Sequence, residues 1–260
     1  MSRITEAILE TTRQGHKAFI PYIMAGDGGL EKLKPTILKL QELGVTAIEV
    51  GIPFTDPVAD GPTIEEAGMR ALAKGVTLRK VLETLAAFAE EITVPLVAMT
   101  YLNPVLAYGI GEFAKDAYDA GIRGVIIPDM PLEESGLVHP SLKAAGIDLV
   151  QLVSLTSTPE RIEKLTKASE GFIYAVTVNG ITGARSTFEG DLESHFKKIQ
   201  SYTDTPVLAG FGISTPEHVK QFGSFASGVI VGSKIVDCLT KDDWDTIEHL
   251  VKASKTVPLA

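Results

Sequence analysis

Short runs of apolar residues recur along the chain, separated by longer segments such as residues 31–43 and 79–92 that show a 3.6-residue helical period. The runs lack alternation of apolar and polar side chains, as expected of parallel strands buried on both faces. Regular alternation of strands and helices is typical of parallel βαβ units. The runs lie at residues 18–24, 46–50, 95–100, 123–127, 148–153, 171–176, 206–209 and 227–231.

The number of these units predicts an α/β fold of the (β/α)8 TIM barrel type. Eight strand–helix units in 260 residues match that fold in count and size. The alternative is an open doubly wound sheet, but no G-x-G-x-x-G motif follows the first run. We expect residues 1–14 to form an extra N-terminal helix over the bottom of the barrel. No linker or charge block interrupts the chain, so residues 1–260 are expected to form a single barrel domain.

Composition narrows the partners that the protein is expected to have. The formal net charge of −9 repels a phosphate backbone and argues against nucleic acid as a main partner. A single cysteine, Cys238, cannot form an internal disulfide, which fits a reducing compartment. The sequence has neither a signal-peptide pattern nor an apolar stretch of the ~18 residues needed to span a membrane. We therefore expect a cytoplasmic protein with no membrane association.

A glutamate ends the second apolar run, at the start of "EVGIPFTDPVADGPTI". Active sites of TIM barrels lie at the C-terminal ends of the strands, where Glu49 falls. Because side chains alternate along a strand, Ala47, Glu49 and Gly51 share one face, which we expect to point into the barrel. Burial should raise the pKa of Glu49 toward ~6–7, suitable for a general acid or base. A structural glutamate paired with a buried cation is the alternative, although Arg123 is the only basic residue in the runs.

Two aspartates follow in the same loop. Asp56, in "TDP", is expected to be a turn residue with local hydrogen bonds. Asp60 is also compatible with a turn, but its place on the same loop as Glu49 favours a pair of carboxylates that divides acid and base roles. We expect Asp60 to lie nearer solvent and to stay ionised.

Glycines gather in the loops that follow the last three runs. These loops read "TVNGITGARST" (177–187), "GFGIST" (210–215) and "VGSKIV" (231–236). Glycine lets backbone N–H groups approach an anion, and phosphate sites in TIM barrels use the loops after strands 7 and 8 with a helix N-terminus. Gly212, Gly232 and Ser233 are therefore candidates to bind a phosphate group, and with it a small phosphorylated substrate.

Other chemistry is not indicated by the sequence. The histidines lie away from the strand ends, so no metal site is expected, and no run carries a lysine for a Schiff base. Several large side chains near strand ends would either pack in the core or form the walls of a pocket for a flat aromatic ligand. They are Tyr22, Met99, Tyr101, Tyr174 and Phe211.

Together these motifs resemble the tryptophan synthase α subunit family, over essentially the whole chain. The resemblance rests on "IEVGIPFTDPVADGP" (48–62), the G-I-T-G loop at 180–183, "GFGIS" (210–214) and the Gly-Ser pair of "VGSKIV". It implies a (β/α)8 barrel that acts as a lyase in tryptophan biosynthesis. The implied reaction is the retro-aldol cleavage of indole-3-glycerol phosphate to indole and glyceraldehyde 3-phosphate.

The resemblance also implies residue roles. Glu49 matches the catalytic acid and base, and Asp60 matches the carboxylate that binds the indole N–H. Thr182 and Gly183 fall in the loop after strand 6, which is mobile in the family. The positions that match phosphate-binding residues are Gly183, Gly212, Gly232 and Ser233. Those that match walls of the indole pocket are Tyr22, Tyr101, Tyr174 and Phe211.

The implied partner is a β subunit, in an α2β2 assembly, that carries pyridoxal phosphate and consumes the indole. No cofactor is implied for this chain. Two positions depart from the family pattern: Val178 stands where many members carry Arg, with Arg185 nearby, and Tyr22 stands where Phe is common.

Three other functions share part of the pattern. A related sugar-phosphate isomerase or synthase would share the phosphate loops but not the 48–62 motif. A stand-alone indole-3-glycerol-phosphate lyase would share every motif and need no partner. A non-catalytic barrel that gates a partner enzyme would be expected to lose Glu49 or Asp60, and both are present.

Overall fold

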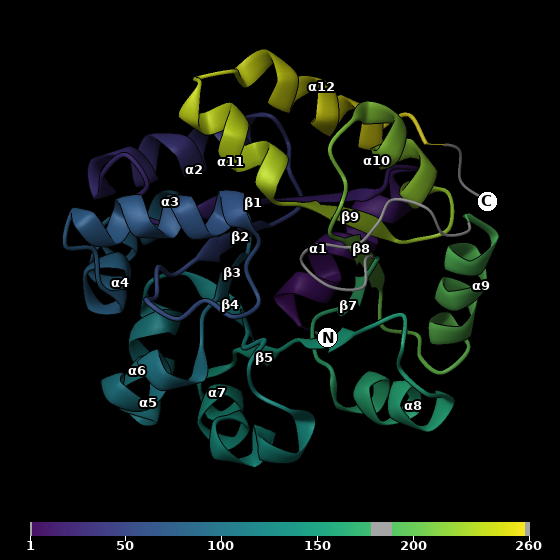
Figure 1. Ribbon diagram of the computed structural model, residues 1–260, viewed down its shortest axis with the longest axis horizontal. Coiled ribbons are helices and arrows are strands. Elements are labelled where there is room, and N and C mark those ends of the chain that lie inside the picture. Colours follow the sequence, from purple (N-terminus) through teal and green to yellow (C-terminus); the bar gives the residue numbers. More distant parts are fainter. Residues whose placement is uncertain (1, 178–188, 258–260) are drawn as a thin grey trace.

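In the computed structural model, which describes residues 2–177 and 189–257, nine parallel strands form one sheet that curls into a nearly closed barrel with helices around it (Figure 1). The order of the strands around the barrel is β5-β4-β3-β2-β1-β9-β8-β7-β6. Their bounds are β1 Ala18–Met24, β2 Ile48–Gly51, β3 Leu96–Met99, β4 Ile122–Ile126, β5 Asp148–Leu149, β6 Gln151–Val153, β7 Ile173–Val176, β8 Val207–Gly210 and β9 Gly228–Val231. The predicted TIM barrel is confirmed.

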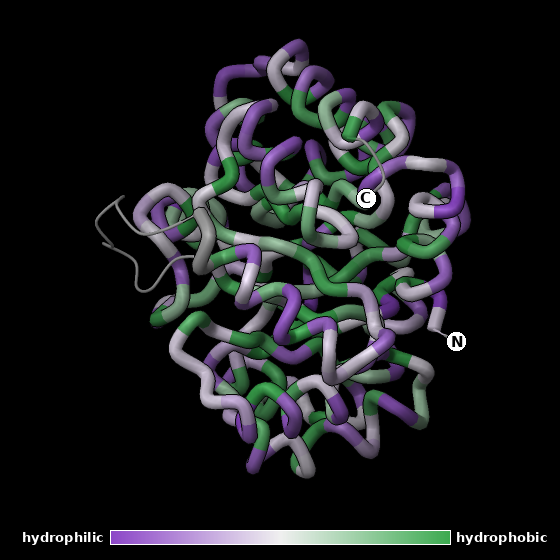
Figure 2. The backbone as a smooth tube through the Cα atoms, turned by 90° about the vertical axis from the view of Figure 1, so that its right-hand side faces the viewer, coloured by the Kyte–Doolittle hydropathy of each residue, from purple (hydrophilic) through white to green (hydrophobic). Residues whose placement is uncertain are grey.

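The helices alternate with the strands as the periodicity predicts. The α-helices are α1 Arg3–Arg13, α2 Leu33–Glu42, α3 Pro62–Ala73, α4 Leu78–Ala86, α5 Leu102–Tyr108, α6 Ile110–Asp119, α7 His139–Ala145, α8 Pro159–Ala168, α9 Glu189–Gln200, α10 Pro216–Gly223, α11 Ser233–Thr240 and α12 Trp244–Ser254. Within the described part of the chain, three short 3-10 helices accompany them: η1 Leu30–Lys32, η2 Ala89–Glu91 and η3 Leu132–Leu137. Hydrophobic segments concentrate in the middle of the molecule and hydrophilic ones on the outer helices (Figure 2).

The run predicted as one strand at residues 148–153 is divided into β5 and β6 at Val150. The backbone N–H of Val150 donates to Val125 O (3.0 Å), whereas that of Gln151 donates to the Ser169 hydroxyl (2.9 Å). β5 pairs with β4, and β6 pairs with β7. This one segment therefore joins the two ends of the sheet and brings the barrel close to closure.

Side-chain alternation divides the core into an inner and an outer layer. Ala47 belongs to the cluster inside the barrel, whereas Ile48 and Val50 pack in the layer between strands and helices. The inward orientation predicted for the face that holds Glu49 is thereby confirmed.

The extra N-terminal helix closes one end of the barrel. α1 lies at the centre of the ring of strands (Figure 1), and its fully buried Ile4 and Ile8 join the inner cluster. The Thr5 hydroxyl donates to Gly171 O (2.8 Å), just before β7 begins. Ile4 lies so close to Gly124 on β4 that a Cβ there would be 2.5 Å from the Ile4 Cδ1. The opposite end, where the strands have their carboxyl termini, is left for the candidate site.

Candidate active site

Glu49 lies on β2 inside the barrel, near the carboxyl ends of the strands. The strand registers place it between Tyr22 on β1 and Val97 on β3. Its side chain is almost completely buried, with 1% of the residue exposed, and its Oε2 atom has no hydrogen-bond partner among the described residues. None of the ion pairs within residues 2–177 and 189–257 involves it. The alternative of a glutamate paired with a buried cation is thus not supported by the described contacts.

Burial controls the protonation of Glu49. Loss of solvation, followed by the negative charge of Asp60, raises the pKa of Glu49 to about 8. This is higher than the predicted ~6–7, because the described surroundings supply no cation and leave one carboxyl oxygen without a donor. Near neutral pH, Glu49 is therefore mostly protonated and able to donate a proton.

Asp60 lies in the loop between β2 and α3. The residue is 9% exposed, against 1% for Glu49, so it lies nearer solvent than Glu49, as expected, although it is itself buried. Its Oδ1 accepts a hydrogen bond from the Tyr101 hydroxyl (2.9 Å), and that hydroxyl in turn accepts one from the Ala59 N–H (3.1 Å). The loop folds back onto β3 through these bonds, which is why Asp60 is covered.

The protonation of Asp60 reflects two opposing effects. Burial raises its pKa to about 6, although the hydrogen bond from Tyr101 acts to lower it. At pH 7 a carboxyl group with that pKa is about 90% ionised. Near neutral pH a mostly protonated Glu49 therefore lies beside a mostly ionised Asp60, with both pKa values raised.

Asp56 forms local hydrogen bonds of the turn and is not part of the pair of carboxylates formed by Glu49 and Asp60. Its side chain is exposed and accepts from the neighbouring Thr55 hydroxyl (2.6 Å), while its backbone carbonyl accepts from the Val58 N–H (2.9 Å). These local bonds agree with the turn interpretation of "TDP".

Two tyrosines lie over glycines of neighbouring strands beside Glu49. A Cβ on Gly51 would be 1.9 Å from the Tyr22 hydroxyl oxygen, and one on Gly210 would be 2.3 Å from the Tyr174 ring. Any larger residue would therefore displace the rings. Burial is the main cause that raises the pKa of both tyrosines, and the charge of Glu49 adds to it in each case. Both hydroxyls consequently stay protonated.

The remaining predicted pocket residues border the same space. Met99, at the end of β3, is partly buried and packs against both core layers. Tyr101 is buried and packs against Phe54, with ring centroids 5.3 Å apart. Phe211 follows β8, is 37% exposed, and lies 5.8 Å from the Tyr174 ring. The aromatic residues predicted from the sequence thus gather around the carboxylates.

The glycine loops after β8 and β9 leave backbone donors free. Gly212 has a positive φ of 74°, and Gly232 precedes α11, whose first residue is Ser233. Within the described part of the chain, the N–H groups of Gly212, Gly232 and Ser233 donate to no acceptor. Free N–H groups on adjacent strand ends, one set at a helix N-terminus, can bind a phosphate group.

Part of the predicted site lies outside the described residues. This applies to Thr182 and Gly183, and also to Val178 and Arg185. The structure adds a residue that the sequence reasoning did not single out, Thr177, which is buried and donates to carbonyl groups of the β8 loop. A hydroxyl placed directly after an apolar strand run was the signal for it.

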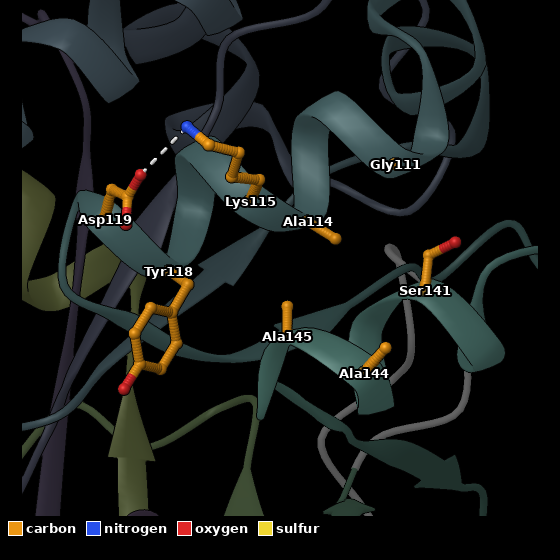
Figure 3. A pocket seen from close by; sticks show the side chains of 8 residues that line it. All are labelled: Gly111, Ala114, Lys115, Tyr118, Asp119, Ser141, Ala144 and Ala145. Carbon is orange, nitrogen blue, oxygen red and sulfur yellow. Dashed lines mark hydrogen bonds and ion pairs between the residues drawn. The ribbon is translucent and has the colours of Figure 1, made fainter.

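Two surface hollows lie elsewhere, each of about 380 Å³. One lies between α6 and α7 and is lined by small side chains, by Tyr118 and by the ion pair of Lys115 with Asp119 (3.2 Å; Figure 3). The other lies near the start of β5, beside Asp148. Neither includes a residue of the predicted site. In residues 2–177 and 189–257, no three His, Cys, Asp or Glu residues are grouped so as to hold a metal ion, and none of the helices has the length and apolar character to cross a membrane.

Comparison with known proteins matches this geometry to one family. The sequence profile described as "Tryptophan synthase alpha chain" matches residues 9–258. The tryptophan synthase alpha chain of Bacillus cereus is 50% identical over 250 residues, which cover 96% of this chain and 97% of that protein. A solved structure of Mycobacterium tuberculosis tryptophan synthase superimposes with a TM-score of 0.90 at 33% identity, over 98% of both chains. The solved structure of tryptophan synthase subunit alpha of Legionella pneumophila superimposes with a TM-score of 0.89 at 29% identity, over 99% of this chain and 100% of that one.

Proposed function

This chain belongs to the tryptophan synthase alpha chain family, and we propose that Glu49 and Asp60 carry out its lyase reaction. That reaction cleaves indole-3-glycerol phosphate to indole and glyceraldehyde 3-phosphate in tryptophan biosynthesis. The observation that supports the assignment is the pair of buried carboxylates at the carboxyl ends of the strands, one with a pKa of about 8 and the other of about 6. Two carboxyl groups held in different protonation states can divide acid and base roles.

In this proposal, Glu49 moves both protons. The protonated carboxyl group donates a proton to C3 of the indole ring, which places positive charge on the ring nitrogen. The resulting carboxylate accepts the proton of the glycerol hydroxyl next to the bond that breaks. The oxygen electrons then form the aldehyde, and the electrons of the C–C bond restore the aromatic ring. Glu49 ends protonated as it began, so the protons balance.

Asp60 is proposed to stabilise the charge on the ring nitrogen. As C3 gains a proton, the indole N–H becomes more acidic, and its hydrogen bond to the Asp60 carboxylate strengthens. The bond from Tyr101 occupies Oδ1 and holds the carboxylate in one orientation, leaving Oδ2 to face the substrate. Tyr22, Tyr174 and Phe211 supply flat surfaces on which the indole can rest.

The glycerol phosphate is proposed to bind across the ends of β8 and β9. Free N–H groups of Gly212, Gly232 and Ser233 support this assignment, as does the N-terminus of α11. Anchoring the phosphate fixes the distance between C3 and Glu49, which lowers the entropic part of the barrier. Gly183 and Thr182 are proposed to contribute from the loop after β7, on family resemblance alone.

We propose a β subunit as the partner, in an α2β2 assembly, with pyridoxal phosphate held by that subunit and no cofactor in this chain. Large apolar side chains exposed after three successive strands support a docking surface near the barrel mouth: Val58, Leu106 and Leu137. A biosynthetic role and a single buried cysteine fit a cytoplasmic location. The whole chain is proposed to act as one domain.

The release of glyceraldehyde 3-phosphate from indole-3-glycerol phosphate, with saturating β subunit, tests the catalytic assignment. Glu49→Gln keeps the shape of the side chain but cannot exchange protons, so release should fall to near background while glycerol 3-phosphate still binds. Asp60→Asn should reduce turnover by about 10²–10³, as for other electrostatic stabilisers. Glu66→Gln, an exposed change on α3, is the matched control and should leave turnover unchanged. Most activity surviving in Glu49→Gln would refute the assignment.

A further inference from the structure

The Thr177 hydroxyl binds two successive carbonyl groups on the neighbouring strand end. Thr177 directly follows β7 and is buried. Its Oγ1 donates to Gly210 O (2.8 Å) and also to Phe211 O, so that one hydroxyl proton is shared between two acceptors. The backbone N–H of Thr177 donates to Gly210 O as well (3.0 Å). The β8 loop is therefore tied to β7 by three contacts from a single residue.

The backbone that Thr177 holds is in an unfavourable conformation. Phe211 has a φ of 74°, in the left-handed region that a bulky residue rarely adopts, and Gly212 follows with the same φ. An ordinary extended residue at position 211 would direct its carbonyl toward β9, because successive residues of a strand face opposite neighbours. Instead, the Phe211 carbonyl points back to Thr177. The hydrogen bond from the Thr177 hydroxyl to the Phe211 carbonyl thus explains why the backbone turns at Phe211.

The direction of the carbonyls fixes the direction of the donors. No peptide bond in the described residues is cis, and a trans peptide points its C=O and its N–H to opposite sides. Since the carbonyls of Gly210 and Phe211 face β7, the N–H groups of Phe211 and Gly212 both face away from it, toward the end of β9. The Phe211 N–H faces Ile230, with which Gly210 is paired in the ladder of β8 and β9. The Gly212 N–H donates to no acceptor in the described part of the chain, so this N–H is the one available to an anion.

From this geometry we infer that Thr177 is a positioning residue for the substrate phosphate, on which it acts by orienting the peptide between Phe211 and Gly212, without touching the ligand. The free N–H groups of Gly232 and Ser233 at the start of α11 lie on the β9 side of the same space. By orienting the Gly212 N–H after β8, Thr177 therefore allows a phosphate group to be bound by N–H groups from both the β8 side and the β9 side. This inference rests on the proposed function, because it deepens the assignment of the phosphate site.

Thr177→Val tests the inference, since valine keeps the β-branched shape and removes only the hydroxyl. Thr177→Ser keeps the hydroxyl and is the matched control, and Thr177→Ala is a second variant without it. Calorimetry with glycerol 3-phosphate should show binding weakened about tenfold in Thr177→Val and Thr177→Ala, and changed less than twofold in Thr177→Ser. Binding of indole, which has no phosphate, should be unchanged in all three. Turnover with β subunit should show KM raised about tenfold, with kcat near that of the wild type.

The outcomes separate the inference from the function on which it rests. Equal affinity of Thr177→Val and wild type for glycerol 3-phosphate would overturn the positioning role while leaving the lyase intact. Parallel loss of indole and glycerol 3-phosphate binding would also overturn it, because a general structural role would then explain both. Failure of the wild type itself to bind glycerol 3-phosphate or to cleave indole-3-glycerol phosphate would remove the proposed function instead.

Discussion

At the scale of single residues, the most informative feature is a carboxyl group buried without a cation among the residues that the structure describes. The folded-state pKa of Glu49 is raised from 4.5 to about 8, so between these values the folded protein holds a proton that the unfolded chain has released. The contribution of Glu49 to the stability of the folded state is therefore fully present below about pH 4.5 and is lost as the pH rises toward 8. Glu49 is thus a residue that opposes folding at the pH where it is proposed to act.

We predict that Glu49→Gln raises the melting temperature relative to the wild type by an amount that grows with pH. Glutamine has no charge to bury, so it escapes the loss of stability that ionisation of Glu49 causes. Thermal melts at about pH 5 and about pH 8.5 should show a small difference at the lower pH and a gain of several degrees at the higher. Glu66→Gln should show no such trend. A Glu49→Gln protein that melts below the wild type at both pH values would mean that the glutamate stabilises the fold.

The two carboxyl groups are also predicted to titrate as a pair. The kcat/KM profile should rise through about pH 6, as Asp60 ionises, and fall above about pH 8, as Glu49 loses its proton. In Asp60→Asn the acidic limb should disappear. Its basic limb should move to lower pH, because the charge of Asp60 is one cause of the raised Glu49 pKa. A basic limb that stays in place in Asp60→Asn would argue that the two groups are not coupled.

At the scale of elements, α1 is predicted to be an integral part of the barrel. Ile4 is fully buried against Gly124 inside the ring of strands, so Ile4→Ala would leave a cavity in a close-packed core. The free energy of unfolding should fall by about 2–5 kcal/mol, measured by urea denaturation. Glu10→Ala on the exposed side of α1 should change it by less than about 0.5 kcal/mol. Equal small effects of both changes would show that α1 is only loosely attached.

The loop between β2 and α3 illustrates how a segment can be predicted correctly while the degree of its burial is not. Its prolines and glycines predict an irregular segment, and an irregular segment is usually exposed. The hydrogen bonds of Tyr101 to Asp60 and Ala59 instead fold the loop over β3 and bury the carboxylate. The partner of that bond lies 41 residues away, beyond the reach of local pattern reasoning.

At the scale of the whole molecule, the exposed apolar residues near the barrel mouth are predicted to bind the β subunit. Val58, Leu106 and Leu137 are 69%, 45% and 49% exposed. Changing all three to Ser should weaken the complex about tenfold or more, because buried apolar anchors dominate interface energies. Turnover at limiting β subunit should fall and should recover when that subunit is added in excess.

A matched control lies on α6, away from the barrel mouth. Tyr118 is also an exposed large hydrophobic residue, but it lies near the C-terminal end of α6 and borders the surface hollow between α6 and α7 (Figure 3). Tyr118→Ala should leave the affinity for the β subunit unchanged. Unchanged affinity in the triple variant as well would place the interface elsewhere.

The sequence by itself determined the fold class and most of the site. Uninterrupted apolar runs that alternate with helical periods specify buried parallel strands, and their count specifies the barrel. Because active sites of barrels lie at the carboxyl ends of the strands, position along the chain was enough to select Glu49, Asp60 and the glycines after the last two strands. Roles for these residues, and the single-domain organisation, remain predictions.

Only the tertiary structure decided the features that depend on groups far apart in sequence. The division of residues 148–153 into β5 and β6 reflects pairing with two different strands at the point where the barrel closes. The depth of Asp60, and hence its raised pKa, follows from its contact with Tyr101. The direction of the Gly212 N–H follows from the hydrogen bond between the Phe211 carbonyl and the Thr177 hydroxyl, which lies just after the adjacent strand β7. Local patterns determine which residues reach the mouth of the barrel. Their burial and the direction of their hydrogen bonds depend on the sequence-distant residues that lie next to them once the barrel has formed.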